Sequence, residues 1–127
     1  MTKISVNAMP RVLVLTSGHE VIEPSESLTP GKIYNSNRAM ICGLLEDLGF
    51  HKITHYHVSD APEELDSEIN HVLKLSEEAD IIISSGGVSV GLFKCGLVRH
   101  LMVRLPQKVR LSLVCPVIQG LPLMGGI

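Results

Sequence analysis

The sequence predicts an α/β fold of three layers, with helices on both faces of a mainly parallel sheet. Short apolar runs of strand length alternate along the chain with segments that have helical periodicity. The most apolar run leads directly into a loop rich in glycine and serine at 84–91. This alternation indicates βαβ units with right-handed crossovers. With 127 residues, 45% of them hydrophobic, the chain is expected to form a single domain over residues 1–127.

The first strand is expected at 11–16, where the sequence RVLVLT is short and apolar enough for burial on both faces. It ends at Ser17 and Gly18. A tight turn is expected at 29–32, because Pro30 presets the first turn dihedral and Gly31 accepts a positive φ at the next position. This turn leads to the first helix.

The first helix is expected to begin at Ser36 or Asn37, whose side chains can cap its free N–H groups, and to end at Gly49. The helical spacing i, i+3, i+4, i+7 predicts its core face, which consists of Ile41, Leu44, Leu45 and Leu48.

A second strand is expected at 53–58, followed by a second helix. Asp60 and Glu63 have the spacing of a capping box at the start of that helix. The residues predicted to face the core are Leu65, Ile69, Val72 and Leu73.

The third strand, Ile81–Ile83, is expected to be the most buried. Beyond the loop at 84–91, a helix is expected at 95–104. A last strand is expected at 109–115, where apolar residues alternate with Arg110 and Ser112.

Composition and charge exclude several classes of function. The net charge is -2 and the 11 Lys and Arg residues are spread along the chain, so no nucleic-acid partner is expected. Three widely spaced cysteines give neither a disulfide framework nor a zinc pattern, which fits a reducing cytoplasm. Because no apolar run approaches the roughly 20 residues of a membrane span, no membrane contact is expected.

Small-residue loops follow the first and third strands, and both are expected at the carboxyl ends of a parallel sheet, where such folds bind ligands. Their N–H groups and hydroxyls suit phosphate oxygens. The candidate ligand-binding residues are Ser17, Gly18, Asn37, Ser84, Ser85, Gly86, Gly87, Val88, Ser89 and Gly91. The spacing is neither that of a P-loop nor that of a dinucleotide fingerprint, so a purely structural turn is an equal alternative.

For other polar residues a structural interpretation stands beside the functional one. Glu20 could ligate a cation or be solvated at a strand end, and Asp60 could act in a site or only cap a helix. Asn35 and Asn37 could bond a ligand edge or the turn backbone. His55 and His57 share one face of a strand but have no third ligand nearby in sequence, so a metal site there is not expected.

Five segments, in order, resemble the molybdopterin molybdotransferase family, the MoeA and gephyrin type with a MogA-like fold. They are LTSGHE at 15–20, TPGKIYNSN at 29–37, LLEDLG at 44–49, VSDAP at 58–62 and SGGVSVG at 85–91. The resemblance covers residues 11–100 and continues more weakly to the end of the chain.

The resemblance implies a role in molybdenum-cofactor biosynthesis: binding of molybdopterin or adenylyl-molybdopterin, with molybdate and a cation such as magnesium. It makes Glu20 and Asp60 the candidate catalytic residues. His19, Asn35, Ala61 and Leu92 stand where the family usually has Asp. A non-catalytic binding or assembly relative is therefore one alternative, and a generic nucleotide-phosphate binder is another. A homo-oligomer is expected, because the sheet would otherwise leave an exposed edge.

Overall fold

The structure is a computed structural model of the chain. It describes residues 2–58, 62–85 and 109–113. Of the predicted elements, the loop at 86–91 and the helix at 95–104 lie outside these ranges, as does Asp60.

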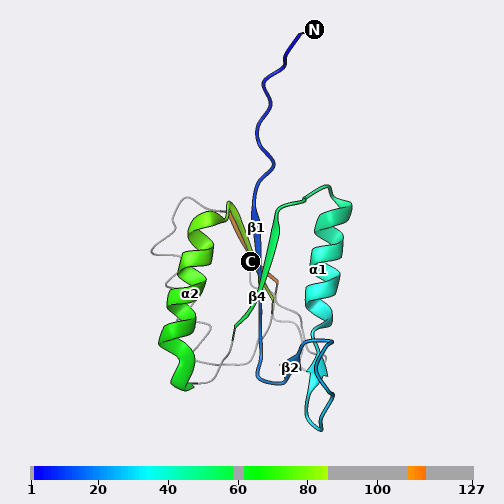
Figure 1. Ribbon diagram of the computed structural model, residues 1–127, viewed down its shortest axis with the longest axis vertical. Coiled ribbons are helices and arrows are strands. Elements are labelled where there is room, and N and C mark those ends of the chain that lie inside the picture. Colours follow the sequence, from blue (N-terminus) through cyan, green and yellow to red (C-terminus); the bar gives the residue numbers. More distant parts are fainter. Residues whose placement is uncertain (1, 59–61, 86–108, 114–127) are drawn as a thin grey trace, which may run out of the picture.

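A four-stranded parallel sheet forms the centre of the molecule (Figure 1). Its strands are β1 (Val12–Ser17), β4 (Ile53–Val58), β5 (Ile81–Ser85) and β6 (Val109–Leu113), in the spatial order β4-β1-β5-β6. Each neighbouring pair is parallel. The prediction of an α/β fold with a parallel sheet is confirmed, since parallel neighbours require crossover connections of the kind that helices supply.

Helices cover both faces of the sheet, which gives the three layers expected from the sequence (Figure 1). Helix α1 (Ser36–Asp47) lies on one face and helix α2 (Leu65–Glu78) on the other, preceded by the short 3-10 helix η1 (Pro62–Glu64). No helix in the described part of the chain has the length and apolarity needed to cross a lipid bilayer.

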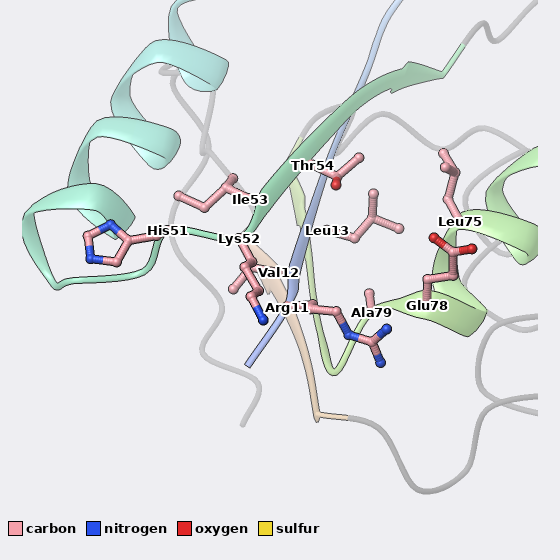
Figure 2. Close-up of a pocket in the computed structure, with 10 residues that line it drawn as sticks. All are labelled: Arg11, Val12, Leu13, His51, Lys52, Ile53, Thr54, Leu75, Glu78 and Ala79. Atoms are coloured by element: carbon pink, nitrogen blue, oxygen red, sulfur yellow. The ribbon is translucent and has the colours of Figure 1, made fainter. Parts of the chain in front are cut away.

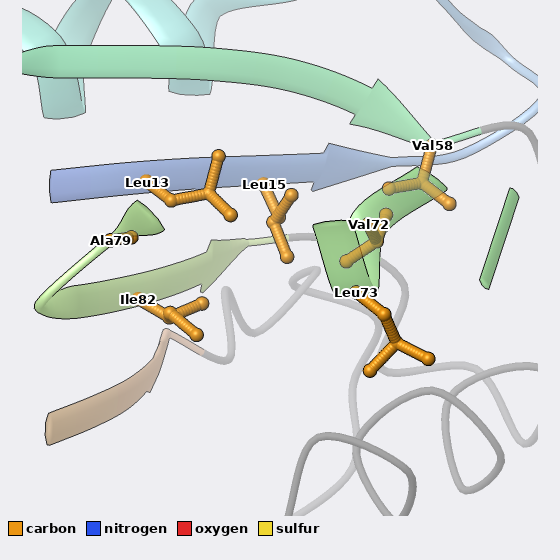
Figure 3. Close-up of a cluster of buried hydrophobic side chains, with 7 residues drawn as sticks. All are labelled: Leu13, Leu15, Val58, Val72, Leu73, Ala79 and Ile82. Atoms are coloured by element: carbon orange, nitrogen blue, oxygen red, sulfur yellow. The ribbon is translucent and has the colours of Figure 1, made fainter. Parts of the chain in front are cut away.

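Strand β1 separates two hydrophobic clusters because successive side chains of a strand point to opposite faces. Leu13 and Leu15 pack with Val72 and Leu73 of α2 (Figure 3). On the other face, Val12 and Val14 belong to a second cluster. The further buried members of that second cluster are Ile41, Leu45 and Ile83.

Helix α1 differs from its prediction in its start and in its core face. Its N-cap is Asn35, whose side-chain oxygen accepts a hydrogen bond from the Arg38 N–H at 3.1 Å, so the predicted caps Ser36 and Asn37 are wrong. Leu44 and Leu48 are 60% and 65% exposed, and only Ile41 and Leu45 of the predicted face are buried. Arg38, in the first turn of this helix, is exposed and its guanidinium pairs with Glu23.

Helix α2 begins later than the capping pattern predicts. Its N-cap is Glu64, which makes no side-chain capping bond, and the three residues before α2 form η1. Val72 and Leu73 are buried as expected, and Ile69 is partly buried.

The turn at 29–32 is confirmed. The Lys32 N–H donates to the Thr29 carbonyl at 3.0 Å, and Gly31 has φ +81°. Two short strands on either side of this turn were not predicted from the sequence. They are β2 (Val21–Ile22) and β3 (Ile33–Tyr34), and they pair in parallel. They are too short to show a period, and they bring the segment after β1 beside the start of α1.

Candidate functional site

The carboxyl edge of the sheet collects the polar side chains that end three strands. Thr16 of β1 pairs in register with Ser85 of β5 on one side and with His57 of β4 on the other. Ser85 is only 6% exposed, while Ser17 and Ser84 are half-buried. The predicted residues Ser17, Gly18, Ser84 and Ser85 therefore lie at one edge. Gly86, Gly87, Val88, Ser89 and Gly91 are outside the described residues.

The loop after β1 turns tightly at Gly18. This glycine is buried with φ +139°, and its carbonyl accepts a hydrogen bond from the Val21 N–H at 3.1 Å. A Cβ atom at Gly18 would lie 3.0 Å from Glu20 Oε2, so the Glu20 carboxylate folds back over the loop. Glu20 Oε2 also lies 3.5 Å from His19 Nδ1, and the His19 side chain is 81% exposed.

Asn35 joins this edge to the start of α1. It is 4% exposed, and its Nδ2 donates to Thr16 Oγ1 at 3.0 Å and to Glu23 Oε1 at 3.1 Å. Asn37, which was predicted to bind ligand, is half-buried in the first turn of α1. The better-placed asparagine is thus Asn35, since it contacts β1 directly.

Two histidines that the sequence analysis set aside belong to the same cluster. Thr16 Oγ1 lies 2.9 Å from His55 Nε2 and 3.0 Å from His57 Nδ1. His57 Nε2 lies 3.2 Å from the Gly18 carbonyl oxygen. The alternation of His55 and His57 on one face was visible in the sequence, but their register with Thr16, across about forty residues, was not.

Glu23 and Arg38 provide the charges of the cluster. Burial alone would raise the pKa of the Glu23 carboxyl, but hydrogen bonds from Asn35 and Arg38, together with nearby positive charge, lower it overall. Burial lowers the pKa of His55, and the Arg38 charge adds to this effect. The cluster therefore favours an ionised Glu23 and a neutral His55 at neutral pH.

A cavity of about 360 Å³ lies at the opposite, amino edge of the sheet (Figure 2). It is lined by Arg11 at the start of β1, by Lys52 and Thr54 at the start of β4, and by Glu78 near the end of α2. Arg11 is held by Asp80, with Nε and Oδ2 3.3 Å apart. Because open parallel sheets bind ligands beyond the carboxyl ends of their strands, the cluster around Thr16 is the better candidate site.

The described residues do not fit a magnesium site. Among them, no group of three or more His, Cys, Asp or Glu side chains comes close enough to hold a metal ion. Both carboxylate oxygens of Glu23 are already engaged, one by Asn35 and one by Arg38. These residues therefore offer no place for a cation to take part in a reaction.

Parallel strands, helices on both faces and small polar residues at the carboxyl edge define a ligand-binding α/β domain of the open-sheet class. Comparison with known proteins gives its family. Residues 13–93 match the family described as "Probable molybdopterin binding domain", and the chain belongs to this family. The matched region runs from β1 past the end of β5 and includes the whole cluster around Thr16.

Among the relatives of this chain are two staphylococcal proteins. The chain is 40% identical over 92 residues to the molybdopterin molybdenumtransferase of Staphylococcus epidermidis. It is also 40% identical over 91 residues to that of Staphylococcus aureus. Each match covers 72% of this chain but 21% of the relative, so the chain spans about a fifth of the relatives' length.

A solved structure supports the same assignment. The molybdopterin biosynthesis MoeA protein of Pyrococcus horikosii matches with a TM-score of 0.56 and 25% sequence identity. The match covers 72% of this chain and 22% of that chain.

Proposed function

We propose that this chain binds molybdopterin or adenylyl-molybdopterin at the carboxyl edge of its sheet, in the molybdate-insertion step of molybdenum-cofactor biosynthesis. One observation carries the proposal: within the matched region 13–93, the carboxyl ends of β1 and β5 lie side by side, with Thr16 in register with Ser85. Buried hydroxyls and N–H groups at such an edge suit the phosphate of a pterin ligand.

Gly18 gives a direct test, because it is buried at φ +139° and its Cβ position is filled by the Glu20 carboxylate. We expect Gly18→Ala to weaken binding by about tenfold, since backbone strain of this kind costs on the order of 1–3 kcal/mol. Calorimetric titration of the full chain with molybdopterin and with adenylyl-molybdopterin, in the absence of oxygen, measures this.

The matched control is Gly43→Ala, the same substitution at a helical glycine whose Cβ would meet nothing within 4 Å. It is expected to bind like the wild-type chain. Failure of the folded wild-type chain to bind either pterin would refute the proposal. Equal competition by AMP or ATP would instead favour a generic nucleotide-phosphate binder.

A non-catalytic binding or assembly role is the second candidate, and Asn35 favours it. The Asn35 amide donates to both Thr16 and Glu23, which the carboxylate usual in the family could not do. In the same titration, bound pterin that gains no molybdenum when molybdate and magnesium are added would support this second role. Molybdenum insertion would support the transferase role. A homo-oligomer and a single domain over 1–127 stay predictions.

A further inference from the structure

The Thr16 hydroxyl is the hub of the cluster, because three side chains meet at one oxygen. Asn35 Nδ2, His55 Nε2 and His57 Nδ1 lie 3.0, 2.9 and 3.0 Å from Thr16 Oγ1. Thr16 is 3% exposed, so solvent has little access to this oxygen. The Thr16 hydroxyl must therefore form its hydrogen bonds with these three side chains rather than with water.

The position of the hydrogen in each of these three hydrogen bonds follows from which atoms can donate and which can accept. A hydroxyl donates one hydrogen bond and accepts two. Asn35 donates to Thr16, because its other side-chain atom, Oδ1, accepts from the Arg38 N–H. One histidine must then donate to Thr16 Oγ1, and the other must accept the Thr16 proton.

The Gly18 carbonyl decides between the histidines. A carbonyl oxygen can only accept, so His57 Nε2, 3.2 Å away, carries the hydrogen. In a neutral imidazole Nδ1 is then bare, and it accepts the Thr16 proton. His55 Nε2 consequently carries a hydrogen and donates to Thr16. This arrangement satisfies every contact with both rings neutral.

The Thr16 cluster contacts the loop after β1 through the His57 ring, whose Nε2–H donates to the Gly18 carbonyl of that loop. Asn35 and His55 donate to the Thr16 hydroxyl, and Thr16 in turn orients the His57 ring by donating to its Nδ1. Loss of the His57 donor would therefore release the Gly18 carbonyl from the cluster.

Few charged side chains of the described residues act on the two histidines. Glu23, after β2, and Arg38, on α1, act on His55 with opposite signs. Cys42 lies on the same side of the sheet, and burial raises the pKa of its thiol. Glu20 and His19 belong to the loop that Gly18 carries.

We propose that Thr16, His55 and His57 are positioning residues for the loop at 17–20, and that the His57 Nε2–H bond to the Gly18 carbonyl holds this loop ready for ligand. The inference rests on the proposed function, because the loop is part of the proposed pterin site. Gly18 is where the cluster holds the loop, since its carbonyl accepts hydrogen bonds from both His57 Nε2–H and the Val21 N–H.

The test begins without ligand, so it is independent of pterin binding. In nitrogen-15 spectra of the full chain at neutral pH, we expect His57 to be protonated at Nε2 and bare at Nδ1. In His57→Phe the Gly18 and His19 amide signals should move, because the donor to the Gly18 carbonyl is lost. In His57→Gln they should stay close to their wild-type positions, because a glutamine amide can donate to that carbonyl.

The matched control is His51→Phe, which removes an exposed histidine at the amino edge and should leave the Gly18 and His19 signals unchanged. A His57 ring protonated only at Nδ1 in the free protein would overturn the proposal. So would Gly18 and His19 signals that stay unchanged in His57→Phe.

Pterin binding then supplies the functional readout. His57→Gln should bind with an affinity close to that of the wild-type chain, because its amide keeps a donor for the Gly18 carbonyl. His57→Phe should bind about tenfold more weakly, the effect of one lost hydrogen bond. A wild-type chain that binds no pterin at any pH refutes the proposed function, whereas the ligand-free spectra still decide the positioning role.

Discussion

Asn35 is buried and Glu23 is half-buried, and both find polar partners within the cluster. Asn35 uses its oxygen to cap α1 and its amide to bridge Thr16 and Glu23. The cap bond is local, but the bonds to Thr16 and Glu23 do not follow from local sequence, because these partners lie 19 and 12 residues away. The sequence therefore indicated polar residues at this edge, but not which of them meet.

Glu23 provides a prediction at the scale of one residue. Its pKa is lower in the folded chain than the ordinary 4.5, the net result of a burial effect that raises it and bonds from Asn35 and Arg38 that lower it. A lowered carboxyl pKa stabilises the fold above the unfolded pKa, and this stability is lost as pH falls through the folded pKa. We expect Glu23→Gln to be less stable than wild type at pH 7, with the difference shrinking below about pH 4.5.

Urea unfolding from pH 7 to pH 3 measures that difference. Glu46→Gln, which removes an exposed carboxylate of α1, is the control and should stay within about 0.5 kcal/mol of wild type. An unchanged pH profile in Glu23→Gln would show that Glu23 contributes nothing through its charge.

At the scale of the element, strands were predicted more accurately than helix faces. The limits of β4 were predicted as observed, β1 is shifted by one residue from its prediction, and β5 extends two residues beyond it. The apolar runs of β1 and β5 are largely buried on both faces, so no rotation has to be chosen for them. Helix α1 has apolar residues all around it, and only packing selects Ile41 and Leu45 as the face that meets the sheet. Met40, Leu44 and Leu48 remain exposed.

Two leucines of α1 test this choice of face. Leu45 is 8% exposed, and Leu44 is 60% exposed. We expect Leu45→Ala to lower the free energy of unfolding by about 2–5 kcal/mol, because it leaves a cavity in the cluster around Val14 and Ile41. Leu44→Ala should change it by about 0.5 kcal/mol or less. Equal losses in urea unfolding would mean that both faces of α1 are covered in solution.

At the scale of the whole molecule, strand β1 joins the parts of the chain that the structure describes. It pairs with both β4 and β5, separates the two hydrophobic clusters and carries Thr16 at its carboxyl end, next to Gly18. Three layers could be predicted because alternating strands and helices allow few other arrangements. The convergence of Thr16, Asn35 and His57 could not, since it depends on the register of β1 with β4 and on the unpredicted pairing of β2 with β3.

Because both clusters share β1, we expect the chain to unfold as one cooperative unit, as a single domain should. Leu13→Ala on the α2 side and Ile41→Ala on the α1 side should each destabilise by about 2–5 kcal/mol. Each should lower the midpoint of the same single transition, with equal calorimetric and van't Hoff enthalpies. Met40→Ala, at a side chain that is 63% exposed, is the control and should leave the midpoint nearly unchanged. Hydrogen exchange sharpens the test, because loss of protection in α1 alone, with α2 still protected in Ile41→Ala, would contradict a single unit.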